Sequence, residues 1–325
     1  MPCLSKIELD TLFRDGVLVV KLHSDEEMMR MRRERFYAHL HSPYLLPEKR
    51  REFLDIVLGV KGSNQKLLSA FGAYPFINTS RIEREIEQMQ DPVYRQIADR
   101  YSRNTGKQFF SFVAPDRSGY RPKGTKQAAE SWHRDIGSEY SRRPGHGVIG
   151  FGGWISIIGE SRFTCVPGSH LFEPAQPTNK NGFCPATAPD PKNVKVFEIP
   201  EGYTILFFSS IVHCVTSSAS TANHQRQWIA GGITDSAEGN FHDPETIKKH
   251  TESGLLSPWK IPSGQDNVYM PRLWGVNSPD KRDEMLKFLD PAYVDKRTRT
   301  LLPHAPCEYY PPYSREEAAF YRAHE

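Results

Sequence analysis

Residues 194–234 read VKVFEIPEGYTILFFSSIVHCVTSSASTANHQRQWIAGGIT, and this stretch decides the fold class. Its short segments are rich in β-branched and aromatic residues, which are typical of strands, and turn-forming residues separate them. The segments are Val194–Ile199, Tyr203–Phe208, Ile211–Val215 and one that opens at Arg226, with Pro200-Glu201-Gly202 as a turn. This pattern predicts a mainly β body, and the rest of the chain is interpreted around it.

The composition is that of a folded globular chain. Of 325 residues, 38% are hydrophobic and 25% are charged, and 42 Lys and Arg against 39 Asp and Glu give a net charge of +3. Such a chain can bury a sizeable core, and its charge alone names no partner. No apolar run reaches the roughly 18 residues that a membrane span needs, so we expect no membrane contact.

The cysteines and the first residues predict a reduced, cytoplasmic location. Five cysteines are present, an odd number without a CxxC pair, which argues against a disulfide framework and against a zinc ribbon. The opening MPCLSKIELDTLFRDG carries acids where a signal peptide needs an apolar stretch. We therefore expect an intracellular protein without a signal peptide.

Helices flank the β body in the sequence. Before it, we expect a helix over Ile7–Phe13, a strand over Val17–Leu22 and a helix whose capping box is Ser24 with Glu27. Asp91-Pro92 has the form of an N-cap followed by proline at the first helical position, which predicts two helices within 80–101. After it, helices are expected over Pro244–Ser253, Asp280–Leu289 and Ser314–His324.

The chain is expected to form a single domain, 1–325, in three parts. Residues 1–108 hold the N-terminal strand and helices, 109–234 hold the β core, and 235–325 form a C-terminal helical extension rich in proline and aromatic residues. Within the second part, Phe109–Val113 is predicted as a strand and 114–130 as a polar, basic loop.

The motif Trp132-His133-Arg134-Asp135 carries the first chemistry, at the end of a predicted strand. Residues two apart in a strand point to one face, so His133 and Asp135 can converge on one metal ion. The motif alone is equally compatible with a surface turn. His213 lies in a β context where it can act as a third ligand, and two histidines with one carboxylate form a facial triad that leaves positions on Fe(II) open for a chelating acid and O₂.

Arg226 is the second candidate, because it opens a strand whose face it shares with Trp228, Ala230 and Gly232. The small residues deeper on that face leave room for a ligand. An arginine that projects into an apolar interior needs an anionic partner, since a bare buried charge is very costly. A ligand carboxylate held by both guanidinium nitrogens would meet that need.

Taken together, the motifs WHRD, VPGSH at 166–170, EGYTILFFSSIVH at 201–213 and an arginine 13 residues later resemble the phytanoyl-CoA dioxygenase-like branch of the Fe(II)/2-oxoglutarate-dependent oxygenases. The N-terminal pattern LFRDGVLVVKLHSDEE is similar to the same branch. The resemblance covers about residues 7–35 and 109–234. The turn at 159–164, GESRFT, departs modestly from the family pattern.

The resemblance implies a double-stranded β-helix core, also called a jelly roll, as in cupins. It implies that His133, Asp135 and His213 are the iron ligands and the catalytic residues, and that Arg226 binds the far carboxylate of 2-oxoglutarate. The residue that holds the near carboxylate varies in the family, and Ser156, Thr164 and Trp228 are candidates. The implied cofactors are Fe(II), 2-oxoglutarate as co-substrate and O₂.

Five further side chains are expected to have supporting or unrelated roles. His170 is expected to be structural or to support the metal ligands rather than bind metal, and His146 and His224 are expected to be solvated imidazoles in loops. Cys214 points to the opposite face from His213 and is expected in the core. Trp132 is expected to pack under the ligands.

The implied reaction is hydroxylation of a small molecule with release of succinate and CO₂. Arg121, Lys123 and Lys126 before the metal motif, and Arg142 and Arg143 after it, could attract an anionic substrate, or they are ordinary solvated loop charges. Two alternatives remain: an oxygenase that acts on a protein or nucleic acid, and a non-catalytic jelly-roll module for binding or assembly. Nucleic acid is disfavoured because no reader motif is present. The oligomeric state is not specified by the sequence.

Overall fold

The computed structural model describes residues 3–29, 31–32, 45–50, 52, 55, 74–75, 80–135, 148–172 and 184–235, with short pieces at 287, 291, 294–295 and 300–301. Apart from Lys287, the three helices predicted near the C-terminus lie outside the described residues, as do His146, Arg142 and Arg143. The pieces near the C-terminus include a two-stranded sheet, β12 (Val294–Asp295) with β13 (Thr300–Leu301).

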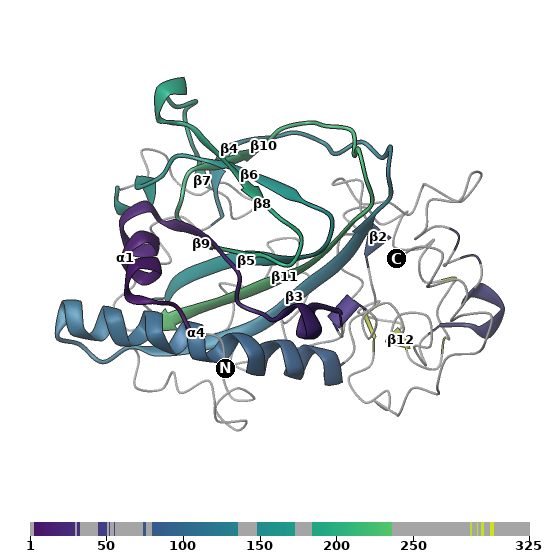
Figure 1. Ribbon diagram of the computed structural model, residues 1–325, viewed down its shortest axis with the longest axis horizontal. Coiled ribbons are helices and arrows are strands. Elements are labelled where there is room, and N and C mark those ends of the chain that lie inside the picture. The colour runs from purple at the N-terminus through teal and green to yellow at the C-terminus, as the bar shows by residue number, and fades with distance from the viewer. Residues whose placement is uncertain are drawn as a thin grey trace.

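Two antiparallel sheets form the body (Figure 1). The larger sheet has six strands, in the order β1 (Val17–Val20), β9 (Thr204–Phe208), β5 (Val148–Ile158), β11 (His224–Thr234), β3 (Phe110–Arg121) and β2 (Tyr74–Pro75). The smaller sheet has five, in the order β7 (Cys184–Pro185), β4 (Glu130–Arg134), β10 (His213–Val215), β6 (Ser161–Cys165) and β8 (Lys195–Ile199).

The chain crosses between the two sheets again and again. It passes from β3 in the larger sheet to β4 in the smaller, back to β5, over to β6 and β8, back to β9, over to β10 and finally to β11. Eight strands wound in this way between two facing sheets are a jelly roll. The predicted fold class, mainly β with flanking helices around a double-stranded β-helix, is therefore confirmed by the strand order itself.

Two apolar clusters hold the body together. One lies between the sheets and joins Trp154, Ile205 and Phe207 of the larger sheet to Phe163 and Ile199 of the smaller. The other lies behind the larger sheet, where α1 (Lys6–Asp15) and α4 (Ser80–Thr105) cover it (Figure 1). The side chains of the larger sheet therefore alternate between two buried environments, which explains why its strands are apolar on both faces.

Helix α4 corrects one prediction, because residues 80–105 form one helix rather than two. Pro92 lies inside it, although proline removes a backbone donor and usually kinks a helix at a cost of about 3 kcal/mol. The next turn buries Val93, Tyr94 and Ile97 completely. Burial of those three side chains offsets the cost of the proline, so the helix continues.

Strand β3 corrects another, because it continues to Arg121 through a stretch predicted as loop. Pro115 and Gly119 disfavour a strand by propensity. The backbone nevertheless pairs with β11 from Phe110 to Arg121, with one irregularity in register next to Pro115. Pairing with a long neighbouring strand overrides the local preference here.

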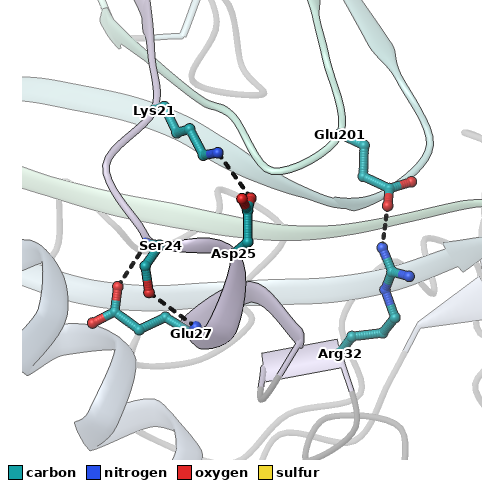
Figure 2. A network of polar contacts seen from close by, with 6 residues as sticks. All are labelled: Lys21, Ser24, Asp25, Glu27, Arg32 and Glu201. Atoms are coloured by element: carbon teal, nitrogen blue, oxygen red, sulfur yellow. Dashed lines mark hydrogen bonds and ion pairs between the residues drawn. The ribbon is translucent and has the colours of Figure 1, made fainter.

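The N-terminal segment is fastened to the jelly roll by polar contacts (Figure 2). The predicted capping box is present: Glu27 N–H donates to Ser24 Oγ at 3.2 Å, and the Glu27 carboxylate accepts from Ser24 N–H at 2.8 Å. Arg32 donates to the carbonyl of Ile157 at 2.9 Å and pairs with Glu201, which also accepts from Gly159 N–H. The helical residues after Ser24, which include Arg32, are thereby held against the β5–β6 and β8–β9 turns.

Short 3₁₀ turns lie at Pro47–Lys49 (η1), Ser169–Leu171 (η3) and Pro191–Asn193 (η4). Within the part of the chain that the structure describes, the search for a helix long and apolar enough to cross a membrane finds none.

Candidate metal centre

The three predicted metal ligands meet at one end of the jelly roll. His133 lies near the end of β4, and Asp135 follows directly after that strand. His213 begins β10, and the two histidines are paired residues on adjacent antiparallel strands. Asp135 N–H donates to the carbonyl of Ser209 at 2.9 Å, which ties the carboxylate's backbone to the turn that leads into β10. Sheet pairing and this bond bring the ligands together.

The ligand atoms are close enough to share one ion. Asp135 Oδ1 lies 3.6 Å from His133 Nε2 and 3.4 Å from His213 Nε2. The two imidazole centroids are 4.3 Å apart, and the candidate ligand atoms of all three residues lie within 4.8 Å of one another. Spacings of this size are what three donors reach around a single transition-metal ion, whose bonds to N and O are about 2.0–2.2 Å.

Backbone carbonyls orient both imidazoles. His133 Nδ1 lies 2.7 Å from the carbonyl of Ser131, and His213 Nδ1 lies 3.0 Å from the carbonyl of Ile211. A carbonyl can only accept, so each Nδ1 carries the proton and each Nε2 keeps its lone pair for the ion. This is the outer support that metal-binding histidines typically have.

The charges suit a cation. Burial alone would raise the pKa of Asp135, but the His213 and His133 imidazoles hold it well below the usual range of a carboxyl group. Burial would lower the pKa of His133, but the hydrogen bond and charge of Asp135 outweigh it and the pKa is raised. Asp135 is thus an ionised ligand between two imidazoles.

Apolar rings surround the centre on the inner side. Phe163 and Phe207 stack on each other at 4.6 Å, and they lie 5.2 Å and 5.7 Å from the His213 ring. The side chains of His133 and His213 are 10% and 7% exposed, whereas that of Asp135 is 35% exposed. The two histidines are therefore recessed, and Asp135 is the most exposed of the three side chains.

Arg226 lies on β11 opposite Ser156 of β5. Its guanidinium carbon lies 5.3 Å from the centre of the Trp154 ring, which belongs to the cluster between the sheets. Burial, and then the charge of Arg121, lower the pKa of Arg226 to about 10. A guanidinium in such a position favours an anion beside it.

The three candidates for the near carboxylate are placed differently. Ser156 is completely buried beside Arg226, and its Oγ lies 2.7 Å from Ser161 Oγ. Trp228 pairs with Trp154 and packs against the inner cluster. Thr164 lies on the opposite face of β6 from Phe163 and Cys165, both of which belong to that cluster, so the structure does not bring it together with the others.

Small residues line the inner face of the larger sheet beside the metal centre. Positions 230 and 232 of β11 pair with Gly152 and Gly150 of β5. Gly150 is linked to the centre through two backbone bonds, because its carbonyl accepts from Ser209 N–H and the Ser209 carbonyl accepts from Asp135 N–H. The strand that carries these small residues is therefore joined through its backbone to the residues of the candidate metal centre, while the Phe207 ring packs against Gly152.

Two polar residues were interpreted wrongly from the sequence. His224 begins β11 and is buried, not solvated, because that strand starts earlier than expected. Arg121 is also buried and is not a loop charge, since it donates to Gln127 Oε1 and to the carbonyls of Thr125 and Ser218. Lys123 and Lys126 are exposed, as a basic loop requires.

Other expectations are confirmed or refined. His170 contacts the carbonyl of Phe13 at 3.1 Å and stacks on Phe208, so it joins η3 to α1. Cys214 was expected in the core, but it is only half-buried and belongs to neither apolar cluster; on β10 it pairs with Thr164. Ser161 was missed: its Oγ accepts from Trp154 Nε1 at 2.8 Å. The alternation of Ser161 with Phe163 and Cys165 along one strand is the signal that places it on the inner face.

No protein-family model matches the chain, and comparison with curated proteins finds no match. Solved structures with a similar fold include EvdO2 from Micromonospora carbonacea var. aurantiaca, at 15% identity and a TM-score of 0.43, covering 71% of this chain and 91% of that one. They also include EctD from S. alaskensis in its apoform, at 12% identity and a TM-score of 0.44, covering 70% and 77%.

A third is the epimerase SnoN in complex with Fe³⁺, alpha ketoglutarate and nogalamycin RO, at 14% identity and a TM-score of 0.44, covering 71% of this chain and 83% of that one. All three likenesses are distant.

Proposed function

We propose that this protein is a non-haem Fe(II)- and 2-oxoglutarate-dependent oxygenase. The observation that carries the proposal is the convergence of two histidine Nε2 atoms and one carboxylate, with both Nδ1 atoms fixed by backbone carbonyls, at one end of a jelly roll. A donor set of two imidazoles and one carboxylate on one side of an ion is the facial triad that suits Fe(II).

The residues present fit a 2-oxoglutarate–iron pair. His133, Asp135 and His213 would hold the metal, and Arg226 would hold the far carboxylate of the co-substrate. Bound Fe(II), 2-oxoglutarate and O₂ would supply the oxidation, which yields succinate and CO₂ and hydroxylates a substrate C–H bond. The protein's own part is to fix these groups and to keep water out, which the stacked Phe163 and Phe207 beside His213 support.

The finer proposal is a hydroxylase that acts on a small molecule. Asp135 occupies the carboxylate position of the triad. By resemblance to the family this favours hydroxylation over halogenation, since a halogenase needs that position free for a halide ion. The recessed histidines favour a substrate that can enter between the sheets, and this weighs against a bulky protein or nucleic acid. We also propose that the substrate is anionic, because the exposed Lys123 and Lys126 could attract a negative charge. The non-catalytic module is the alternative that the first experiment addresses.

The test is an anaerobic titration with Fe(II) and then with 2-oxoglutarate, followed by visible absorption. We expect a charge-transfer band in the wild type, because it arises only when 2-oxoglutarate chelates the iron through two oxygens. His133→Ala and Asp135→Ala should lose the band and all turnover while keeping the apo melting temperature, since both residues serve the metal and lie outside the apolar clusters.

The outcomes separate the candidate functions. A band in the wild type alone supports the oxygenase and justifies a screen of small molecules for succinate formation. A folded wild type without a band contradicts the proposal and favours a binding module. Unfolding of both variants would show instead that the ligand residues are structural.

A further inference from the structure

We propose that Ser169 is a positioning residue that sets the orientation of the His213 imidazole. The inference rests on the proposed function, because it concerns how well the folded protein binds the metal. Ser169 touches neither metal nor substrate. It acts through one peptide group that lies between its hydroxyl and the imidazole.

The hydroxyl of Ser169 holds the residue before the ligand. Ser169 is buried, and its Oγ accepts a hydrogen bond from Val212 N–H at 2.8 Å. The Val212 carbonyl is held as well, because it accepts from Val166 N–H at 2.9 Å. Both backbone groups of Val212 are therefore tied to the turn formed by residues 166–169.

The imidazole contacts the other side of the same peptide group. His213 Nδ1 donates to the carbonyl of Ile211 at 3.0 Å, and that carbonyl shares its peptide bond with Val212 N–H. A peptide group is planar, so its N–H and C=O point in opposite, fixed directions. When Ser169 fixes the direction of the N–H, it also fixes the carbonyl that holds the His213 ring.

The turn that carries Ser169 is itself anchored. Gly168 adopts the left-handed conformation, with φ of 78°, and its N–H donates to the carbonyl of Asp15 at 2.7 Å. His170, the residue after Ser169, contacts the carbonyl of Phe13. Both anchors lie on α1, so Ser169 is positioned by an element outside the strands that carry the ligands.

A second side chain, that of Arg134, also holds the segment 209–212. Arg134, which lies between the ligands His133 and Asp135, donates from Nη1 to the Ser210 carbonyl at 2.5 Å. The segment 209–212 is thus held from the β4 side by Arg134 and from the η3 side by Ser169. Of these two, the Ser169 bond is the one that acts on the peptide group in contact with His213.

Loss of the hydroxyl should act on metal affinity. Without Ser169 Oγ, the buried Val212 N–H has no acceptor, and the peptide can regain one only by rotating. Rotation would move the carbonyl away from His213 Nδ1 and free the ring. Removal of groups that orient metal-binding histidines typically weakens metal binding by 10–100-fold, and we expect about tenfold here because Ser169 acts one step further away.

The experiment compares Ser169→Ala with Ser169→Thr and Ser210→Ala. Thr keeps the hydroxyl, and Ser210→Ala makes the same chemical change in the segment 209–212 that Ser169 contacts, at a residue that meets Arg134 through its carbonyl. Co(II) is titrated anaerobically into each apo protein, and the Kd and the position of its visible d–d bands are recorded. The apo melting temperature is measured alongside, because a purely structural role would change it without changing the bands.

We expect Ser169→Ala to raise the Kd for Co(II) about tenfold and to shift the bands of the saturated protein. Ser169→Thr should restore both, and Ser210→Ala should match the wild type. Should the Ala variant fail to fold, Ser169→Cys has nearly the same shape and a weak acceptor, and the same result is expected of it. Wild-type Kd and bands in Ser169→Ala would overturn this inference alone, whereas a wild type that binds neither Co(II) nor Fe(II) would overturn the proposed function with it.

Discussion

Arg226 is the residue whose substitution should separate co-substrate binding from metal binding. It lies between the sheets over Trp154, where burial lowers its pKa to about 10. Arg226→Gln should raise the 2-oxoglutarate KM at least about tenfold, because a charge-assisted, two-point contact to a carboxylate is lost. The Fe(II) affinity should stay within about twofold, since the residue is not among the metal ligands.

Arg226→Lys is the matched control for that prediction. Lysine keeps the charge but lacks the planar fork, so the KM should rise by less than in Arg226→Gln. The anaerobic titrations that follow the charge-transfer band give the dissociation constants of Fe(II) and 2-oxoglutarate, and the rise in KM should appear there as a rise in the 2-oxoglutarate Kd. Unchanged 2-oxoglutarate affinity in the Gln variant would show that Arg226 is a structural residue.

At the scale of single residues, the sequence predicted which three side chains converge but not how they are oriented. His133 and Asp135 could be found because a spacing of two residues in a strand places them on one face. The carbonyls of Ser131 and Ile211, which select the tautomers, belong to the backbone and have no signature in the sequence. His224 was misplaced because its burial depends on where β11 begins, which is a property of the paired strands.

Among the elements, the packing of β5 against β9 gives a sharp prediction. A Cβ at Gly153 would lie 2.1 Å from the carbonyl oxygen of Ile205, a backbone atom of the neighbouring strand. A Cβ at Gly152 would meet the end of the Phe207 ring at 2.9 Å, and a side chain can turn away. Gly153→Ala should therefore destabilise the protein by about 3 kcal/mol or more, and Gly152→Ala by less.

Urea unfolding of the two variants measures the difference. Each change adds one methyl group to adjacent positions of the same strand, so the comparison isolates what the methyl group meets. Gly152→Ala should also disturb the metal centre more than its stability suggests, because Phe207 lies 5.7 Å from the His213 ring. Equal losses of unfolding free energy in the two variants would contradict this prediction. They would mean that β5 and β9 move apart for the Gly153 methyl group as easily as the Phe207 ring turns away from the Gly152 methyl group.

Elements were predicted well where the local pattern and the pairing agree. The strands at 195–199 and 204–208 and the helix at 6–15 belong to that class. Helix α4 and strand β3 were predicted too short for one common reason. Pro92 and Pro115 oppose the element locally, while burial in one case and pairing with β11 in the other act over a distance that a local pattern does not contain.

For the whole molecule, the fold and the metal centre depend on each other. The chain crosses from one sheet to the other at the turn 209–212, and that turn carries the backbone contacts of Asp135, Arg134 and Ser169. The order in which the strands pair could be expected only through the resemblance to a known family. Contacts between α1 and η3 connect the N-terminal segment to the candidate metal centre. No local sequence pattern predicts these contacts.

Stability should fall as the solution becomes acidic, because two buried histidines and one partly buried histidine are held in the neutral form. Burial is the largest cause of the lowered pKa of His23, His170 and His224, and for His224 the charges of Arg226 and Arg121 add to it, giving a pKa of about 4. The unfolded chain binds protons near the ordinary histidine pKa of 6.5, before the folded protein does. The stabilisation is therefore complete above that pKa and is lost as the pH falls from it toward the folded value.

His224→Gln should flatten this dependence. From its pKa of about 4, His224 alone should cost the wild type about 2 kcal/mol of unfolding free energy between about pH 7.5 and about pH 5. The variant should lose correspondingly less over the same interval, while His133, whose pKa is raised, contributes the opposite slope in both proteins. Urea unfolding of the metal-free proteins at the two pH values gives the difference, and an identical loss in both would show that His224 is not held neutral by its surroundings.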